Sequence, residues 1–387
     1  MALRQRPFKK PVAEVSRRTT PDIKLKDPTE RYLSRHKDHD SSLDIPYWMS
    51  TGNTMLDCAI SGGKGIPGGM LTVLVGDEQT GKSVELFLMM AICQMHGGFV
   101  HAQDSERRWT PGLASLTNVD TTDSRLWYMN QPTSLEEALQ NIEDFCDDIA
   151  CSPIEEFERP KLVVLDSIAS LDPEPSKEDI KKGVRAANQP MGTAAFLTRF
   201  FKKKQIKLMR KRNFFMVWTN QLRDFVDMTG GPVNKFAPKK MNQPGGRALK
   251  HATSVRIETS KKNINDVLLA AEKEANEADF PAGDLLCYKI TKNVVGPPLR
   301  RAFMPWFYHM GADELLGMFQ WLYDTGYITW SSGKGGGYSM WGHAAPRQQW
   351  LDHLYSDADA RAGFREYFKA AYLDLSLYKN SAVFGPG

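Results

Sequence analysis

The sequence predicts an α/β protein in which helices cover both faces of a mostly parallel sheet. Two observations carry this prediction. Apolar runs rich in β-branched residues alternate with longer segments of helical spacing along most of the chain. A glycine-rich turn also joins the apolar run 70–76 to the helical stretch that follows it. Strands that alternate with helices pair in parallel through crossovers, and such a sheet is buried on both faces.

The expected elements follow one another in a regular order. Short apolar runs predict buried strands at 70–76, 99–102, 126–130, 161–169 and 213–220, and later at 254–260, 285–294 and 300–310. Segments with helical spacing predict helices at 28–39, 134–150, 192–212 and 313–323, of which 192–212 is strongly basic. The alternation holds up to about residue 310 and then stops, which indicates a change of architecture there.

Four regions are therefore expected. Residues 1–27 are predicted to be a flexible basic arm, because eight Lys and Arg side chains stand against two acids in the first 26 residues. Such an arm either contacts DNA phosphates or an acidic neighbour, or is a solvated tail. A short segment, 28–44, precedes the core, 45–310. Residues 311–387 are predicted to be a small C-terminal domain, whose aromatic cluster favours a core over a DNA platform: Trp341, Trp350, Tyr355, Phe364 and Tyr367.

Composition limits the class of protein. The net charge of +4 is weakly basic and by itself decides nothing about nucleic acid. Apolar runs stay well below the roughly 20 residues that a membrane span needs, so no membrane partner is expected. Five cysteines lie far apart, without a CxxC pair. This spacing favours a reducing, cytoplasmic setting and argues against a disulfide framework or a zinc site.

The segment 76–83, GDEQTGKS, carries the most specific chemistry. It fits the pattern GxxxxGK[ST] between a predicted strand and a predicted helix. Backbone N–H groups and the helix N-terminus can then surround phosphate oxygens, with Lys82 on the β- and γ-phosphates and Ser83 on Mg²⁺. ATP and Mg²⁺ are the expected ligands. The predicted ATP-binding residues are Gly76, Asp77, Glu78, Gln79, Thr80, Gly81, Lys82 and Ser83.

Acidic residues at strand ends are expected to complete this site. Asp166 ends a buried apolar run, which is where a P-loop needs its metal-side carboxylate; taken alone, it fits a helix cap equally well. The predicted metal residues are thus Ser83 and Asp166. The segment FVHAQDSE offers Asp104 or Glu106 to orient an attacking water. Spacing leaves the choice between these two open, and a plain surface turn is a third interpretation.

The segments around these motifs resemble the RecA family of DNA recombinases. The run STGNTMLDCAISGGKGIPGG precedes the P-loop, and QDSE, LVVLDSIASLDP, PMGTAA, TNQLR, PGGRALKHATSVRIE and ITKNVVGPP follow in the order of that family. The resemblance extends over roughly 45–307. The amino-acid sequence of the core and the arrangement after residue 311 are more similar to phage recombinases of the UvsX type than to cellular RecA.

This resemblance implies roles for particular residues. Glu106 matches the catalytic glutamate, and Gln221 matches a glutamine that senses the γ-phosphate. The implied catalytic set is Glu106, Lys82 and Gln221. Lys250 and Lys292 match residues that reach ATP bound to an adjacent subunit. The sequence departs from the family at three positions: Leu113 replaces an adenine-stacking tyrosine, Val294 a second interface lysine, and His251 an aromatic residue of the subunit contact.

Two segments that follow predicted strands are expected to bind DNA. Their basic side chains can neutralise phosphates, their apolar side chains can wedge between bases or stack on them, and their glycines can turn N–H groups towards a phosphate. Either segment alone would be interpreted as a solvated loop. The candidate residues are Met191 in the first segment and Arg223, Phe225, Val226, Lys235, Lys239, Lys240, Gly245 and Gly246 in the second.

The resemblance implies an ATP-dependent homologous recombinase. Such a chain forms helical filaments on single-stranded DNA, hydrolyses ATP and pairs the bound strand with homologous duplex DNA. Residues 28–44 would then pack on a neighbouring subunit, and mediator and single-strand-binding proteins would be further partners. The main alternative is a hexameric helicase or translocase motor with a similar core. A nucleotide-binding filament protein without turnover and a loader ATPase are two others.

Overall fold

The computed structural model describes residues 44–151, 159–173, 190–203, 209, 212–221, 223–224, 241–242, 246–268, 282–332 and 336–383. The chain divides between Asp44 and Ile45. The predicted basic arm, and the predicted segment 28–44 apart from Asp44, therefore lie outside the described residues. So do the predictions that concern their contacts.

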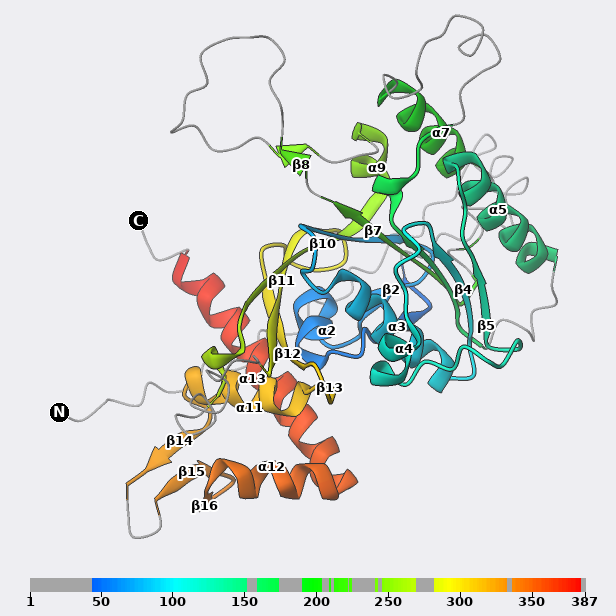
Figure 1. The fold of residues 1–387 in the computed structure, drawn as a ribbon. Coiled ribbons are helices and arrows are strands. Elements are labelled where there is room, and N and C mark those ends of the chain that lie inside the picture. The colour runs from blue at the N-terminus through cyan, green and yellow to red at the C-terminus, as the bar shows by residue number, and fades with distance from the viewer. Residues whose placement is uncertain are drawn as a thin grey trace, which may run out of the picture. The chain divides into compact units, whose positions relative to one another are not determined.

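A nine-stranded sheet forms the centre of the unit 45–387 (Figure 1). The strand order is β13-β12-β11-β10-β3-β7-β6-β4-β5. The six strands from β10 to β5 are parallel, whereas β11, β12 and β13 add antiparallel strands at one edge. The bounds are β3 (Leu71–Gly76), β4 (Phe99–Asp104), β5 (Trp127–Asn130), β6 (Lys161–Asp166), β7 (Phe214–Gln221), β10 (Thr253–Asn263), β11 (Gly283–Asn293), β12 (Arg301–Phe307) and β13 (Gly311–Ala312). The predicted α/β fold with a mostly parallel sheet is confirmed.

Helices pack on both faces of this sheet, and alternation along the strands explains why. In β3, Leu74 belongs to one hydrophobic cluster while Val73 and Val75 belong to the other. The first cluster packs against α2 (Thr54–Ser61), α3 (Lys82–Met95) and α4 (Pro111–Thr117). The second packs against α5 (Leu135–Cys151), α7 (Pro190–Lys202) and α9 (Gly246–Ala252). Each strand thus buries both its faces, which is why the strands read as continuous apolar runs.

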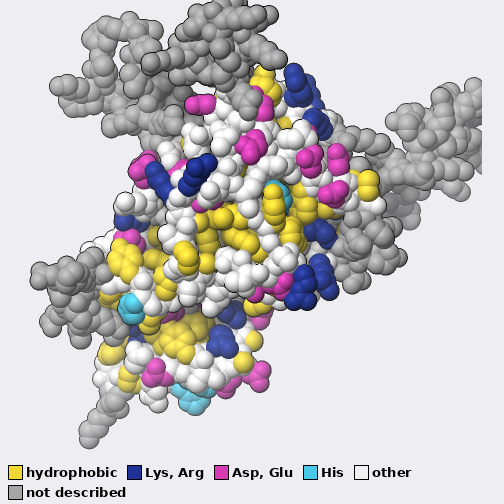
Figure 2. Space-filling model, turned by 45° about the vertical axis from the view of Figure 1, so that its right-hand side comes forward, with side chains coloured by type: hydrophobic (Ala, Val, Ile, Leu, Met, Phe, Trp, Pro, Cys, Tyr) yellow, Lys and Arg dark blue, Asp and Glu magenta, His cyan; other side chains and the backbone are white. Residues whose placement is uncertain are grey.

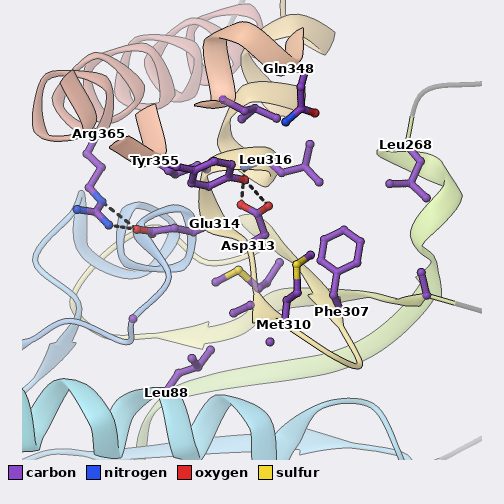
Figure 3. Close-up of a pocket in the computed structure, with 17 residues that line it drawn as sticks. Leu88, Leu268, Phe307, Met310, Asp313, Glu314, Leu316, Gln348, Tyr355 and Arg365 are labelled. Carbon is purple, nitrogen blue, oxygen red and sulfur yellow. Dashed lines mark hydrogen bonds and ion pairs between the residues drawn. The ribbon is translucent and has the colours of Figure 1, made fainter. Parts of the chain in front are cut away.

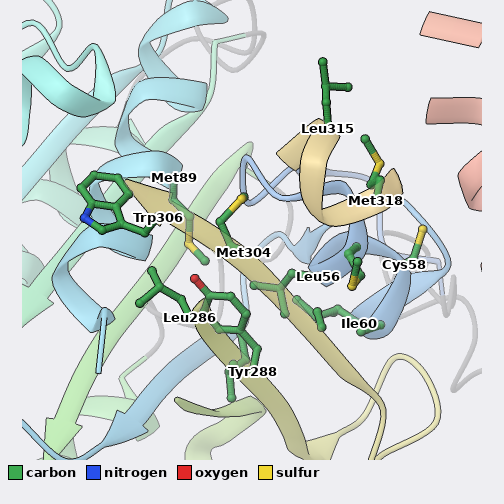
Figure 4. Packing of buried hydrophobic residues seen from close by; sticks show 14 of the residues in the cluster. Leu56, Cys58, Ile60, Met89, Leu286, Tyr288, Met304, Trp306, Leu315 and Met318 are labelled. Carbon is green, nitrogen blue, oxygen red and sulfur yellow. The ribbon is translucent and has the colours of Figure 1, made fainter. Parts of the chain in front are cut away.

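The C-terminal region shares the first hydrophobic cluster. It contains α11 (Glu314–Asp324), α12 (Arg347–Ser356), α13 (Ala358–Val383) and a small sheet of β14 (Thr329–Ser331), β15 (Gly337–Met340) and β16 (His343–Ala345). Figure 4 shows Leu315 and Met318 of α11 beside Met304 of β12, with Leu56 and Ile60 of α2 close by. The region therefore packs against the sheet through one continuous core. Its definition as a separate domain stays a prediction.

Two sequence expectations about helices and aromatics need adjustment. The predicted helix 192–212 was too long, because α7 ends at Lys202 and a turn at 212–213 precedes β7. Within the aromatic cluster, Trp350 and Phe364 are buried, whereas Trp341 and Tyr355 are 47% and 44% exposed. The cluster is thus partly core and partly surface.

Short elements complete the described structure. They are β1 (Trp48–Met49) paired with β2 (Ile66–Pro67), β8 (Arg223–Asp224) paired with β9 (Met241–Asn242), and the 3-10 turns η2 (Ile168–Ser170) and η5 (Ile264–Asp266). Figure 2 shows hydrophobic side chains across the middle of the face it presents, with acidic and basic side chains scattered around them. Charge of one sign does not dominate the described part of this face.

Candidate nucleotide site

The P-loop runs from the end of β3 to the start of α3. Gly76 has no room for a side chain, because an added Cβ would collide with Thr259 of β10. Gly81, just before the helix, has φ +85°, a conformation that glycine adopts at little cost. The Thr80 hydroxyl donates to the carbonyl of Asp77 (2.8 Å) and lies 2.8 Å from the Thr259 hydroxyl. The loop is thus held against the sheet with its helix N-terminus facing the cavity.

Lys82 lies over this loop. Its ammonium donates to the carbonyls of Gly76 (3.0 Å) and Asp77 (2.5 Å), and the residue is only 8% exposed. Burial lowers the pKa of Lys82, while the carboxylates of Asp166 and Glu106 oppose that shift. A cation held in this way is positioned to bind the anionic groups of a nucleotide at the P-loop.

Asp166 ends β6 beside the first turn of α3. Its Oδ2 accepts hydrogen bonds from the Ser83 hydroxyl (2.7 Å) and the Trp109 indole N–H (2.9 Å), and its Oδ1 accepts one from the Thr219 hydroxyl (2.5 Å). The predicted pair of metal residues is therefore in direct contact. A hydroxyl and a carboxylate are the oxygen ligands that Mg²⁺ takes beside nucleotide phosphates, so the donor set fits this ion. Within the described residues, no cluster of three or more His, Cys, Asp or Glu side chains forms an all-protein metal cage.

Glu106 follows β4 and lies on the same cavity. Its Oε1 accepts hydrogen bonds from the Ser167 hydroxyl (2.5 Å) and the Gln221 amide (3.0 Å), and its Oε2 lies 3.3 Å from the Arg108 guanidinium. The side chain is only 13% exposed. The carboxylate thus connects the end of β4 to the end of β7.

Asp104, the other acid that spacing left open, has a different environment. Its carboxylate accepts the backbone N–H groups of Arg108 (3.3 Å) and Trp109 (3.1 Å) and so anchors the loop that follows β4. Burial raises the pKa of Asp104 despite these hydrogen bonds. The residues that line the cavity include Glu106 and not Asp104. Of the two acids, Glu106 is therefore the one that faces the cavity.

The cavity has a volume of about 280 Å³. Besides the P-loop, Glu106, Asp166 and Gln221, it is lined by residues that the sequence analysis did not propose: Arg108, Asp284, Leu286, Trp306 and Tyr308. Trp109, Ser167 and Thr219 were missed as well, although they bond to its two carboxylates. The segment DSERRWT contains Arg108 and Trp109, and VWTNQ contains Thr219, each next to a recognised motif. Their direction towards the site depends on strand order, which the segments do not encode.

A larger cavity of about 880 Å³ lies elsewhere, between β12, α11 and α12 (Figure 3). Leu88, Phe307, Met310 and Leu316 are among its apolar walls. The polar groups at its edge bond to one another: Tyr355 donates to Asp313 (2.5 Å), and Arg365 donates to Glu314 (2.8 Å). By volume alone, this larger cavity would be the candidate ligand site. The convergent charged groups of the smaller one identify it as the nucleotide site.

The two lysines predicted to act across a subunit interface lie together. The Lys292 ammonium on β11 donates to the carbonyl of Lys250 (2.8 Å), in α9. Burial lowers the pKa of Lys292. Neither lysine lines the nucleotide cavity of its own chain. The structure therefore brings them to one place on the surface, away from the P-loop.

The predicted DNA segments begin and end at neighbouring elements. The first starts after β6 and ends at α7; the second starts after β7 and ends at α9. Strands β6 and β7 are adjacent, and a Cβ on Gly246 in α9 would lie 3.7 Å from Ala194 in α7. The β8–β9 pair closes the base of the second segment. The described elements that flank the two segments therefore lie at one end of the sheet (Figure 1).

Most predicted DNA-binding residues lie outside the described structure. Met191 belongs to α7 and Arg223 to β8, and only their backbones are described. Gly246 begins α9 with φ +59°. Those outside the described residues are Phe225, Val226, Lys235, Lys239, Lys240 and Gly245.

These features define a P-loop nucleotide-binding protein: a buried strand, a glycine-bounded loop, a helix that starts with Lys82 and Ser83, and a strand-terminal Asp166. The family described as the RecA N-terminal domain matches residues 35–313. The chain belongs to the RecA family, as the sequence resemblance predicted.

Individual relatives are moderately similar. Protein RecA of Fusobacterium nucleatum is 28% identical over 267 residues, which are 69% of this chain and 61% of that protein. Protein RecA of Rhodopirellula baltica is 31% identical over 255 residues, covering 66% of this chain and 58% of that protein. Protein RecA of Thermus aquaticus is 29% identical over 269 residues, or 69% of each chain. The chain thus spans about three fifths of the length of the first two relatives.

A search for helices with the length and hydropathy of a membrane span found none in the described part of the chain.

Proposed function

We propose that this protein is an ATP-dependent homologous recombinase. It forms helical filaments on single-stranded DNA, hydrolyses ATP when bound to that DNA, and catalyses homologous pairing and strand exchange in recombination, repair and recombination-dependent replication. One observation carries the proposal beyond family membership. The Gln221 amide bonds to Glu106 in the nucleotide cavity, and Gln221 ends the strand that leads to the β8–β9 stem of the second DNA segment.

The nucleotide site divides the chemistry among its residues. The P-loop backbone from Gly76 to Ser83 and the Lys82 ammonium bind the phosphates of ATP. Ser83 and Asp166 hold Mg²⁺, which neutralises phosphate charge when bound. Glu106 orients the attacking water, because its carboxylate is fixed by Ser167 and Gln221 and faces the cavity. This is the arrangement that phosphoryl transfer to water requires.

ATP also acts between subunits in this proposal. Lys250 and Lys292 of one subunit reach the ATP bound by the next, so that a filament is stable only while the γ-phosphate is present. The two residues are neighbours, because the Lys292 ammonium donates to the backbone carbonyl of Lys250, so both could add positive charge opposite the phosphates. Hydrolysis removes the γ-phosphate and weakens the interface and the grip on DNA together.

DNA binds at the end of the sheet where the elements that flank both segments lie. Arg223, Lys235, Lys239 and Lys240 neutralise phosphates, while Phe225, Val226 or Met191 contact bases. Gly245 and Gly246 turn backbone N–H groups to the strand. Contacts of these kinds read little base identity, so binding is largely independent of sequence.

The finer assignments are also part of the proposal. The chain belongs to the phage, UvsX-like branch, and it acts in the cytoplasm of a prokaryotic cell or a phage-infected host, where its five free cysteines stay reduced. The basic arm 1–27, the subunit-contact segment 28–44, the core 45–310 and the C-terminal domain 311–387 are its functional parts. Mediator and single-strand-binding proteins are its further partners.

Electron microscopy combined with an ATPase assay tests the function. We expect extended helical filaments with single-stranded DNA and a non-hydrolysable ATP analogue, and DNA-stimulated phosphate release with ATP. Strand exchange between a circular single strand and a homologous linear duplex should follow. Closed rings with directional unwinding would instead establish the helicase motor, since rings and open filaments arise from different subunit contacts.

A further inference from the structure

Trp109 joins the nucleotide site from the loop that follows β4. Its indole N–H donates to Oδ2 of Asp166 at 2.9 Å, the same oxygen that accepts from the Ser83 hydroxyl. The ring packs edge to face on Phe87 of α3, with centroids 5.0 Å apart, and lies 6.3 Å from the ring of Trp127 of β5. The backbone N–H of Trp109 is fixed by Asp104 at 3.1 Å. Both the ring and the loop that carries it are therefore held in place.

The carboxylate needs such neighbours. The last torsion of an Asp side chain is broad, so the plane of the carboxylate is set by the hydrogen bonds it accepts. Asp166 accepts three side-chain donors, and two of them, Ser83 and Trp109, share one oxygen. Hydrogen bonds to an ionised acceptor are stronger than those between neutral groups, which makes an N–H at this place effective.

We propose that Trp109 is a positioning residue that orients Asp166 and thereby sets the affinity of the nucleotide site for Mg²⁺. The inference rests on the proposed ATP-binding function and deepens it, since no motif in the sequence points to this tryptophan. Trp109 does not line the cavity itself. It acts through Asp166. The loop after β4 fixes the indole, and the indole N–H in turn fixes the orientation of the metal-side carboxylate.

The Trp109→Phe variant separates the hydrogen bond from the packing. Phenylalanine keeps an aromatic ring against Phe87 and removes the N–H. Trp127→Phe is the matched control. Trp127 lies beside the Trp109 ring, and it is not one of the described donors to Asp166. Trp109→His restores an N–H donor on a smaller ring and should recover part of any loss.

The primary measurement is the Mg²⁺ dependence of binding of a fluorescent ATP analogue, without DNA. We expect Trp109→Phe to need about 10-fold more Mg²⁺ for half-maximal binding, the usual scale for loss of an outer-shell partner. Nucleotide affinity in EDTA should not change, and Trp127→Phe should behave as the wild type. In turnover, kcat at limiting Mg²⁺ should fall while the KM for ATP at saturating Mg²⁺ stays the same.

A second measurement uses tryptophan fluorescence of the intact protein. Binding of MnCl₂ with ADP should quench part of the emission of the wild type, because paramagnetic Mn²⁺ would be bound next to the indole. That part should vanish in Trp109→Phe and persist in Trp127→Phe.

Each result has one meaning. Equal Mg²⁺ requirements in wild type and Trp109→Phe would leave Trp109 a packing residue and overturn the inference, whatever the quenching. A wild-type protein that shows Mg²⁺-dependent nucleotide binding but no strand exchange would overturn the recombinase proposal alone. Failure of the wild type to bind nucleotide at all would overturn both.

Discussion

The nucleotide cavity and the apolar cavity differ in what their polar side chains do. In the smaller one, Lys82, Asp166 and Glu106 converge from the ends of three different strands or their following turns on a volume of about 280 Å³. In the larger one, of about 880 Å³, Tyr355 and Arg365 are bonded to the acids Asp313 and Glu314 at the edge. The first set of groups faces a ligand, and the second links helices to one another.

Register explains why the ligand-facing groups meet in the first region. Asp104 pairs with Asp166 across β4 and β6, and Gly76 pairs with Gln221 across β3 and β7. Parallel strands end at one edge, so turns from distant parts of the chain come together there. The C-terminal region has no such edge of parallel strands in its described part, and its polar groups serve stability. Four substitutions test this distinction.

The largest effect is expected for Lys82→Ala. The buried ammonium supplies charge at the P-loop, and its removal should lower DNA-stimulated phosphate release by about 10³-fold. Filaments that depend on ATP should disappear in electron microscopy. Lys64→Ala, an exposed lysine beside Trp48, is the control and should leave both unchanged. Turnover by Lys82→Ala close to that of the wild type would mean that the cavity is not the catalytic site.

Glu106→Gln should separate binding from turnover. The amide can still occupy the position between Ser167 and Gln221, but it cannot act as a base or orient water in the same way. We expect phosphate release to fall by about 10²-fold, with nucleotide affinity retained in equilibrium titration. Glu366→Gln, at an exposed side chain of α13, is the control carboxylate. Equal losses of affinity and turnover would assign Glu106 to binding instead.

Leu316→Ala tests the apolar cavity. Leu316 is 5% exposed and forms part of its wall, so truncation should lower the free energy of unfolding by about 2–3 kcal/mol. Thermal unfolding measures this change, with the exposed Gln349→Ala on α12 as control. ATP affinity should stay the same. A shift in ATP affinity would show that the two cavities are coupled and remove the distinction between them.

The last prediction concerns pH. Burial raises the pKa of Asp57 from its ordinary 3.8 to about 6, although Ser50 and Thr51 donate hydrogen bonds to it. The folded state then keeps a proton that the unfolded state has lost. Stability should therefore decrease by up to about 3 kcal/mol as the pH rises from about 4 to 6, and this contribution should be constant above that range.

Asp57→Asn should remove this part of the pH dependence, because an amide does not titrate. Thermal midpoints of wild type and variant between pH 4 and pH 7 give the difference, in which other titrating groups cancel. Parallel curves for the two proteins would contradict the assignment. Turnover at pH 7 should not change, since Asp57 lies in α2 and is not among the residues that line the nucleotide cavity.

The sequence by itself determined the P-loop, the strand that ends in Asp166, and the parallel α/β class. These features are local: a contiguous motif defines the first, and continuous apolar runs define buried strands, because such strands have no solvent face. The choice between Asp104 and Glu106 was not local. It depends on a turn in which the first carboxylate caps backbone N–H groups and the second reaches Gln221.

The side chains that support the two carboxylates of the nucleotide cavity follow from the tertiary structure. Thr219 reaches Asp166 because β7 lies next to β6, and Trp109 reaches it because the loop after β4 turns back over the sheet edge. Strand order in a parallel sheet differs from chain order, so these neighbours are 53 and 57 residues away in sequence. A pattern of residues along the chain contains no record of contacts at that separation, whereas the folded sheet creates them.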